Sequence, residues 1–489
     1  MKNFTITLYA FHLRHTLVNT PDNLDSSDEV ASQKASILWE DLVELGENYL
    51  PFDGLKNLRS NLVCYKDDEY NSKLEQALPS DWLTANGTLD LGSICTENLQ
   101  IEAELNPFLL NDTYAADLTL FPELPNTSTD VSQVKEFKPR FLMPSTIRAS
   151  LGQTLWIYGE VDENENCQEL ADKYVKALLS GTNLKPSLPK QGELFGSPLF
   201  EYQTKDIKEP YNSTKGCHIL IYINNNNHKS KTLKLLDKAY YSLLNLLCCY
   251  HKILYIYQEA CQRKPEARRI YSKLNSQALE CLSKSAKFDL ELDKMESWLQ
   301  ELPLDAIRYN ICLRDLNTHY ISIKTNIVNY RTCLHEITYT GESDAPNFWK
   351  FFLRNTCKQW KEQIEIDIDY ITSGEDLFEQ MIDSVRGLVE IEEAKRDRSL
   401  ERTVQVGATA MGGGAIVSGI VAEHAKDAIK PPIFKNSSNP ITISLVWSFI
   451  ATIGFGSFAL IWWFLWQRLV APLWKKSKSS NSKNHPKSE

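Results

Sequence analysis

Two clusters of charged and polar residues near the start of this sequence have types and spacing that could support chemistry. Residues 160–165, Glu-Val-Asp-Glu-Asn-Glu, offer hard oxygen ligands of the kind that divalent cations take. His12, Arg14 and His15 stand close together after an alternating apolar segment and could bind an anion. A solvated turn explains the acidic run better than a cation site does, and exposed polar side chains on the surface explain the second group as well as an anion site does.

A third cluster is basic and surrounds Pro265. Its members could touch acidic lipid or nucleic acid, and the plain alternative is an exposed helix corner. They are Arg263, Lys264, Arg268 and Arg269.

No recognised catalytic or nucleotide-binding motif occurs in the sequence. There is no phosphate loop, dinucleotide fingerprint, nucleophile elbow, His-Glu-x-x-His or Cys-x-x-Cys pair. The glycines at 412–414 lie inside an apolar run, where a phosphate loop would not form. We therefore predict a protein that is not an enzyme, with no metal site and no cofactor.

Composition and charge narrow the class of protein further. The 489 residues are enough for two or three units, and 43% of them are hydrophobic. The net charge of −10 is carried by the body of the chain, since the end after 467 is rich in lysine. An acidic body is a poor nucleic-acid binder, so we expect no nucleic-acid partner. Eleven cysteines, an odd number, and the lack of a secretory signal indicate reduced thiols in the cytoplasm.

The first part of the chain predicts a mixed α/β cytoplasmic domain over 1–225. Residues 4–11 alternate with the period of a strand, and further strands are expected at 154–159, 198–202 and 217–223. Helices are expected over 28–49 and 167–179, and roughly 50–150 reads as irregular. The fold class is therefore α+β, with long helices after this domain.

A long-helix bundle is predicted over 231–340. Apolar and tyrosine residues follow a 4-3 spacing from Leu236 to Tyr257 and again from Tyr309 to Ile337, which is typical of coiled-coil packing. Pro265 and Pro303 are expected to end the first and second helices. The apolar segment 241–257 contains His251 and Lys252, which favours a buried bundle helix over a membrane span.

Residues 347–403 predict a helical stalk that leads into a membrane. A helix from 374 to about 421 would contain no proline, and 404–422 is uncharged and rich in small residues. We predict a first transmembrane helix over 404–422. Its glycines would let helices approach closely in lipid. They are Gly407, Gly412, Gly413, Gly414 and Gly419.

A second transmembrane helix is predicted over 441–466, which carries no charge and exceeds the ~20 residues that span a bilayer. Tryptophans at both ends suit the two membrane interfaces. They are Trp447, Trp462, Trp463 and Trp466. Residues 467–489 read as a basic disordered tail. A hairpin places the N-terminal body and this tail on the cytoplasmic side of the cell inner membrane, with two spans.

This order of segments resembles the CorA-like divalent cation transporters over about 230–476. In that family an α/β domain and a helical stalk lead into two membrane helices near the C-terminus. The family's Gly-Met-Asn signature follows its first membrane helix, and 423–440 contains no such triplet. No selectivity residue is therefore carried over. The chain also resembles uncharacterised bacterial proteins that end in a membrane hairpin, a group that includes candidates for signalling and defence.

We predict a membrane-anchored cytoplasmic interaction or sensor protein, in which 1–225 binds a protein or a small molecule. Its partners would be the lipid bilayer and further copies of itself, because a Gly-rich helix face needs a packing partner. The alternative is a divergent CorA-like channel for a divalent cation. Its pore would be lined from the first membrane helix by Thr403, Thr409 and Ser418.

Overall fold

The computed structural model describes most of the chain. The described residues are 1–14, 34–77, 81–207, 215–285, 292–342, 344–372, 374–423 and the single residues Phe449, Ile450, Ile453, Ser457 and Ile461. They form two compact units. The first comprises Met1–Gln277 with Leu304–Phe378, and the second comprises Ala278–Pro303 with Glu379–Glu489.

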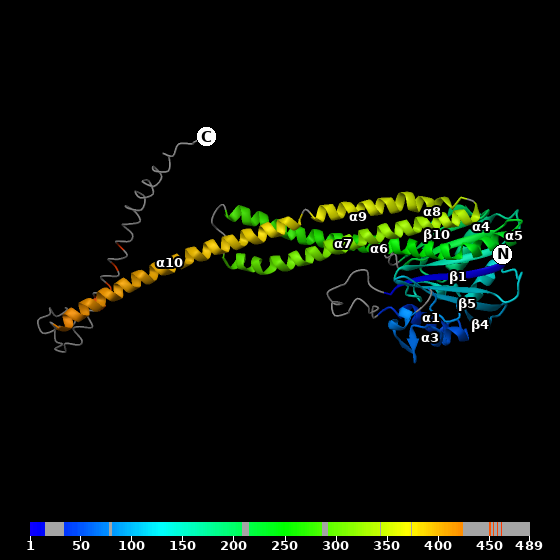
Figure 1. Ribbon diagram of the computed structural model, residues 1–489, viewed down its shortest axis with the longest axis horizontal. Coiled ribbons are helices and arrows are strands. Elements are labelled where there is room, and N and C mark those ends of the chain that lie inside the picture. The colour runs from blue at the N-terminus through cyan, green and yellow to red at the C-terminus, as the bar shows by residue number, and fades with distance from the viewer. Residues whose placement is uncertain are drawn as a thin grey trace, which may run out of the picture. The chain divides into compact units, whose positions relative to one another are not determined.

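The first unit is built on a nine-stranded mixed sheet (Figure 1). The strand order is β4-β5-β6-β1-β7-β11-β10-β8, with β9 paired to β10. Only β11 and β7 run parallel among these pairs. The bounds are β1 Lys2–Leu13, β4 Leu89–Cys95, β5 Gln100–Leu110, β6 Thr113–Pro122, β7 Gly152–Glu160, β8 Leu184–Pro186, β9 Lys190–Leu194, β10 Ser197–Asp206 and β11 His218–Asn224.

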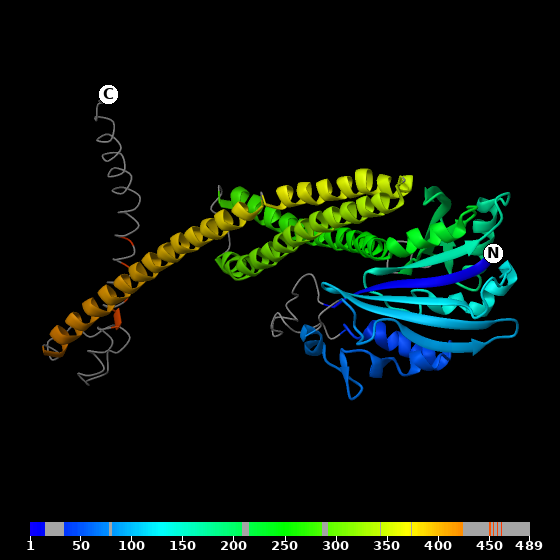
Figure 2. The ribbon, with the colours of Figure 1, turned by 45° about the vertical axis from the view of Figure 1, so that its right-hand side comes forward.

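One face of this sheet carries an apolar core. The even-numbered residues of β1, from Phe4 to Ala10, are fully buried against α1 and α4. Figure 2 shows α1 and the long helices on opposite sides of the sheet. The helices and turns of the domain are α1 Ile37–Asn48, α2 Asp53–Lys56, α3 Leu58–Asn61, η2 Ser72–Ala77, η3 Val131–Phe137, η4 Pro139–Leu142 and α4 Cys167–Leu178, with a small β2 Tyr65–Lys66 and β3 Glu69–Tyr70 hairpin.

The predicted strands at 4–11, 154–159, 198–202 and 217–223 and the helix at 167–179 are confirmed. The prediction of an irregular stretch over roughly 50–150 is wrong, because β4, β5 and β6 lie there. Their outward positions carry Glu, Asn, Asp and Thr, which hid the alternation of the inward side chains. Asn111, with φ of 57°, closes the β5–β6 hairpin in the left-handed conformation that Asn tolerates.

Long helices follow the sheet. They are α5 Lys229–Lys238, α6 Tyr240–Ser285, α7 Leu292–Gly341, α8 Asn347–Phe351, the π-helical turn η6 Phe352–Thr356, α9 Cys357–Thr372 and α10 Glu375–Glu423. The predicted helix ends at Pro265 and Pro303 are wrong, since α6 and α7 continue through them. A proline costs a helix about 3 kcal/mol, and contacts between helices offset that cost. At Pro265 these include ion pairs from Arg263 to Asp315 and from Lys264 to Asp367.

The helix predicted from 374 to about 421 is confirmed as α10, which has 49 residues and acids in its first turn. In the part of the chain that the structure describes, no helix combines the length and the apolar character needed to cross a membrane. The second predicted span, 441–466, and the tail, 467–489, lie outside the described residues except for the five single positions named above.

Candidate functional site

The face of the sheet opposite the apolar core carries a row of polar side chains in lateral register. Each member is paired directly with its neighbour on the next strand, so the row crosses six strands. We call it the polar row. Its members, from β5 to β10, are Asn106, Asp117, Tyr9, Thr154, His218 and Gln203. A sheet face of this kind needs hydrogen-bonding partners when it is covered.

Helix α6 supplies such a partner at the centre of the row. The Thr154 hydroxyl lies 2.8 Å from Nε2 of His251 on α6 and 3.0 Å from Nδ1 of His218. A hydroxyl has one hydrogen, so it donates to one ring and accepts from the other. Burial and the neighbouring His218 lower the pKa of His251 well below its usual value, so His251 is neutral. The helix is thus joined to the sheet through a buried hydroxyl bridge.

Two more contacts join α6 to the row on either side of this bridge. Gln203 donates to the Tyr250 hydroxyl at 2.9 Å, and the Tyr250 ring stacks on His218 with centroids 4.7 Å apart. At the other end Tyr240 donates to Asp117 at 2.5 Å. These contacts repeat along one face of α6 and fix its position along the sheet.

Glu201 on β10 extends the central bridge. His218 Nε2 lies 3.1 Å from one Glu201 oxygen, and the Lys190 ammonium lies 2.6 Å from the other. Burial opposes the charge on Glu201, but these two contacts outweigh it and lower the pKa of the carboxyl group. A carboxylate, an imidazole and a hydroxyl in series resemble a nucleophilic triad. Here Thr154 is fully buried and already bonded to His251, so the arrangement positions α6 and leaves no room for a substrate.

Gly152 makes this approach of α6 possible. It has a φ of 127°, a conformation that L side chains rarely adopt. A Cβ atom there would lie 2.6 Å from Nδ1 of His251. Because glycine has no side chain, the imidazole can occupy this space above the sheet.

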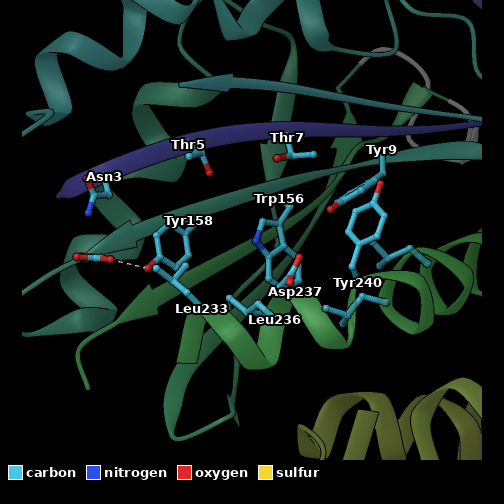
Figure 3. A pocket seen from close by; sticks show the side chains of 13 residues that line it. Asn3, Thr5, Thr7, Tyr9, Trp156, Tyr158, Leu233, Leu236, Asp237 and Tyr240 are labelled. Atoms are coloured by element: carbon cyan, nitrogen blue, oxygen red, sulfur yellow. Dashed lines mark hydrogen bonds between the residues drawn. The ribbon is translucent and has the colours of Figure 1, made fainter. Parts of the chain in front are cut away.

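Beside the polar row lies a cleft of about 440 Å³ between the sheet and helices α5 and α6 (Figure 3). Trp156 and Tyr158 point from β7 towards Leu233 and Leu236 of α5 in Figure 3. This volume lies within the range of small-molecule sites. The full lining is Asn3, Thr5, Thr7, Tyr9, Trp156, Tyr158, Glu160, Leu233, Leu236, Asp237, Tyr240, Leu243 and Leu247.

The structure places the candidate residues near the N-terminus in separate surroundings. His12 is buried, with Nε2 2.9 Å from the Lys34 carbonyl oxygen, so the interpretation of it as a surface residue is wrong. Arg14 forms an ion pair with Glu75, and His15 lies outside the described residues. The acidic run divides into a buried Glu160 and an exposed turn. Among the described residues no group of three His, Cys, Asp or Glu is placed to hold a metal ion.

The basic cluster around Pro265 faces other helices. Arg263 and Lys264 form the ion pairs named above, and the Arg268 guanidinium lies over the Tyr370 ring at 5.7 Å. The prediction of an exposed helix corner is therefore wrong for Arg263 and Lys264, which are half-buried, and it is confirmed for Arg268 and Arg269, which are exposed. The charges of Arg263 and Lys264 are used to hold α6 against α7 and α9.

Of the residues predicted to act in the membrane, the glycines lie in α10 and the tryptophans lie outside the described residues. Gly407, Gly412, Gly413, Gly414 and Gly419 all belong to α10. Their predicted role in helix packing stays a prediction. Trp447, Trp462, Trp463 and Trp466 lie outside the described residues.

Sequence reasoning missed the polar row, although one signal pointed towards it. His251 interrupts the apolar segment 241–257, and a charge-capable residue in such a segment needs a buried partner. The partner, Thr154, could not be named, because it is 97 residues away. No protein-family model matches the chain, and no curated protein matches its sequence.

Proposed function

We propose that this chain is a membrane-anchored sensor protein, in which a ligand of the sheet domain changes how the long helices are held. The cleft is the ligand site in this proposal. The observation that carries this proposal is which elements form the two walls of the cleft. One wall is the sheet, the other is α5 and α6, and α6 is also the helix held by the polar row. A ligand that fills the cleft therefore contacts both sides of the same junction.

A series of contacts connects this junction with the beginning of α10. Tyr250 contacts Phe352 of η6 at 4.8 Å between centroids, and Phe352 contacts Tyr330 of α7 at 5.4 Å. Further along, Tyr257 of α6 stacks on Trp360 of α9 at 4.4 Å. Packed side chains of this kind can transmit a change in position when an element has two arrangements.

The series ends at the turn that precedes α10. Tyr309 of α7 donates to the Ile371 carbonyl oxygen at 2.7 Å and contacts Phe378 of α10 with centroids 5.2 Å apart. A Cβ atom on Gly374 would lie 2.4 Å from the Tyr309 hydroxyl oxygen, so a side chain at this position of the turn would collide with Tyr309. Movement of α7 or α9 would therefore reach the first turn of α10.

We propose that α10 carries this change to a membrane hairpin formed by 404–422 and 441–466, with the N-terminal body in the cytoplasm. The support is the uncharged sequence of both segments and the basic residues that flank them. After cell breakage without detergent, the full chain is expected to sediment with membranes, whereas a chain truncated after 403 is not. A full-length chain that stays in the supernatant would contradict the anchor.

In this proposal, the change in the long helices alters the association of the chain with further copies of itself. Besides the glycines of α10, large apolar side chains on one face of α7 are exposed at positions that differ by multiples of seven. They are Ile307, Ile321 and Val328. Arg314 occupies the position between Ile307 and Ile321, so the apolar stripe is continuous from Ile321 to Val328, where it suits packing against a second copy of the chain. Size measurement in an uncharged detergent is expected to show an oligomer, and a monomer would contradict this part of the proposal.

Filling the cleft tests the coupling directly. Leu236→Trp places a large side chain in the cleft, and Leu235→Trp is its matched control on the same helix, outside the lining. In full-length protein, amide hydrogen exchange is expected to change in α6 and in α10 for Leu236→Trp only. A change confined to α5, or an equal change in both variants, would contradict the sensor proposal.

The alternative proposal is a CorA-like cation channel, and the continuous helix α10 is the observation that favours it. In that family a long helix of this kind leads into the membrane. Flux of Mg²⁺ into liposomes that contain the full chain separates the two proposals. Flux would favour the channel, and its absence together with a response to Leu236→Trp would favour the sensor.

A further inference from the structure

We propose that the cleft binds a small organic cation, an ammonium group that carries apolar substituents. This inference rests on the proposed function, because it names the ligand class of the same site. It starts from the charges of the lining. The described residues that line the cleft include the carboxylates of Glu160 and Asp237 and no Lys, Arg or His.

Glu160 is buried, with only 7% of its surface exposed, so water screens its interactions less than those of the exposed Asp237. One of the Glu160 oxygens accepts a hydrogen bond from Tyr158 at 2.8 Å. Lys2 stands opposite Glu160 in the β1–β7 ladder, yet among the described residues no ion pair joins the two. A buried carboxylate without a cationic partner inside a cleft attracts a positively charged ligand.

Aromatic rings supply the second part of the recognition. Trp156, Tyr158, Tyr9 and Tyr240 all line the cleft. The ring of Tyr222 stacks beside both Trp156 and Tyr158, with centroids 5.9 and 6.0 Å apart. A cation over the face of such rings is attracted by their electron density, and this favours an organic ammonium ion over a hydrated metal ion.

The aromatic wall is held in place before any ligand arrives. The Tyr158 hydroxyl accepts from Asn224 at 3.0 Å and donates to Glu160. Fixed rings lose little conformational freedom on binding, which favours affinity. The opposite wall comes from α5 and α6, and apart from Asp237 and Tyr240 it is apolar. Leu233, Leu236, Leu243 and Leu247 would contact the apolar substituents of the ligand.

Choline and its uncharged isostere 3,3-dimethylbutan-1-ol test the inference, because they differ in the charge and hardly in shape. Both are titrated by calorimetry into full-length protein in an uncharged maltoside detergent. Choline is expected to bind at least tenfold more tightly than the alcohol. Glu160→Gln is expected to reduce choline affinity at least tenfold and to leave the affinity for the alcohol unchanged. Glu163→Gln, an equal change of charge on the exposed turn, should have no effect on either.

Asp237→Asn provides a second variant in case Glu160→Gln does not fold, since Asp237 is exposed on α5. It is expected to weaken choline binding about threefold. Equal affinity for choline and the alcohol, or no binding of choline, would overturn the cation inference. Either result leaves the proposed function standing, because Leu236→Trp tests the coupling without any ligand.

Discussion

The two faces of the central sheet bury different kinds of side chain. The face under α1 and α4 buries apolar side chains such as Phe4, Ile6 and Leu8. The face under α6 buries part of the polar row, namely Asp117, Thr154 and His218, and each of these has hydrogen-bonding partners. Apolar packing contributes most of the stability and tolerates some variation in position. Buried hydrogen bonds contribute less, but they require one arrangement of the partners.

This difference indicates that the two faces of the sheet have different structural roles. The apolar face makes the domain fold, and the polar face determines where α6 lies. A small change at the polar face can therefore alter the position of the helix without unfolding the sheet. The following predictions test this difference in role, beginning with the largest expected effect.

Phe4→Ala is expected to lower the free energy of unfolding of the full chain by about 3–5 kcal/mol, because it opens a cavity in the apolar core. Phe4 is fully buried, with Phe137 and Tyr174 rings at 5.3 Å. Thr5→Ala, on the next residue and the opposite face, is the matched control and should cost below about 1 kcal/mol. Urea unfolding followed by circular dichroism measures both, and equal losses would contradict the difference in role between the faces.

The apolar face was open to prediction from the sequence, whereas the polar face was not. Alternation along 4–11 identified β1 and its inward side, since Phe4, Ile6 and Leu8 recur with the period of a strand. The polar row depends on the register between strands that are far apart in the chain, such as Tyr9 with Asp117. Sequence periodicity holds no information on that register.

The same limit explains why the predicted helix ends at Pro265 and Pro303 were wrong and why no cleft was predicted. Pro265 ends a helix in isolation, and only the distant Asp315 and Asp367 show why α6 continues. The cleft combines β1, β7, α5 and α6, and no local pattern brings these together. Its aromatic and acidic residues were visible in the sequence, but their proximity was not.

Gly152→Ala is expected to cost about 2–4 kcal/mol, from strained backbone and from the collision with His251. Gly87→Ala is the control, since Gly87 also has a positive φ of 80° but no atom within 4 Å of the added Cβ. Gly87→Ala therefore reports the cost of a side chain at a positive φ without a collision. Combining Gly152→Ala with His251→Ala should cost less than the sum of the two, and strict additivity in urea unfolding would contradict a steric contact between them.

Acidification is expected to weaken the polar face through His251. Its pKa in the folded protein is lowered well below the unfolded value of about 6.5, so only the unfolded chain takes up the proton as the pH falls below that value. Stability is therefore lost on acidification, by up to about 1.4 kcal/mol per pH unit for one proton. His251→Gln should reduce this slope between about pH 6.5 and 5, as measured by urea unfolding.

The control for this pH effect is His228→Gln, on an exposed residue directly before α5. The same slope in His251→Gln and in the unmodified chain would show that other groups cause the acid sensitivity. His218 faces His251 across Thr154, and Glu201 and Lys190 lie behind it. The lowered pKa of Glu201 acts in the same direction, but at lower pH, because a carboxylate titrates below an imidazole.

Tyr240→Phe is expected to cost about 1 kcal/mol at neutral pH, because Asp117 loses one of its donors. Burial raises the pKa of Asp117, and the hydrogen bonds from Tyr240, Asn106 and Thr119 oppose that rise. Removal of Tyr240 as a donor should raise this pKa further, so the cost should shrink as the pH falls and the carboxyl group takes up a proton. Tyr241→Phe, a change on the next and more exposed residue, should have no such pH-dependent cost. Urea unfolding of both variants at pH 7 and 5 measures the difference. If the cost of Tyr240→Phe does not depend on pH, the leucines of α6 hold this end of the helix and the hydrogen bond to Asp117 does not.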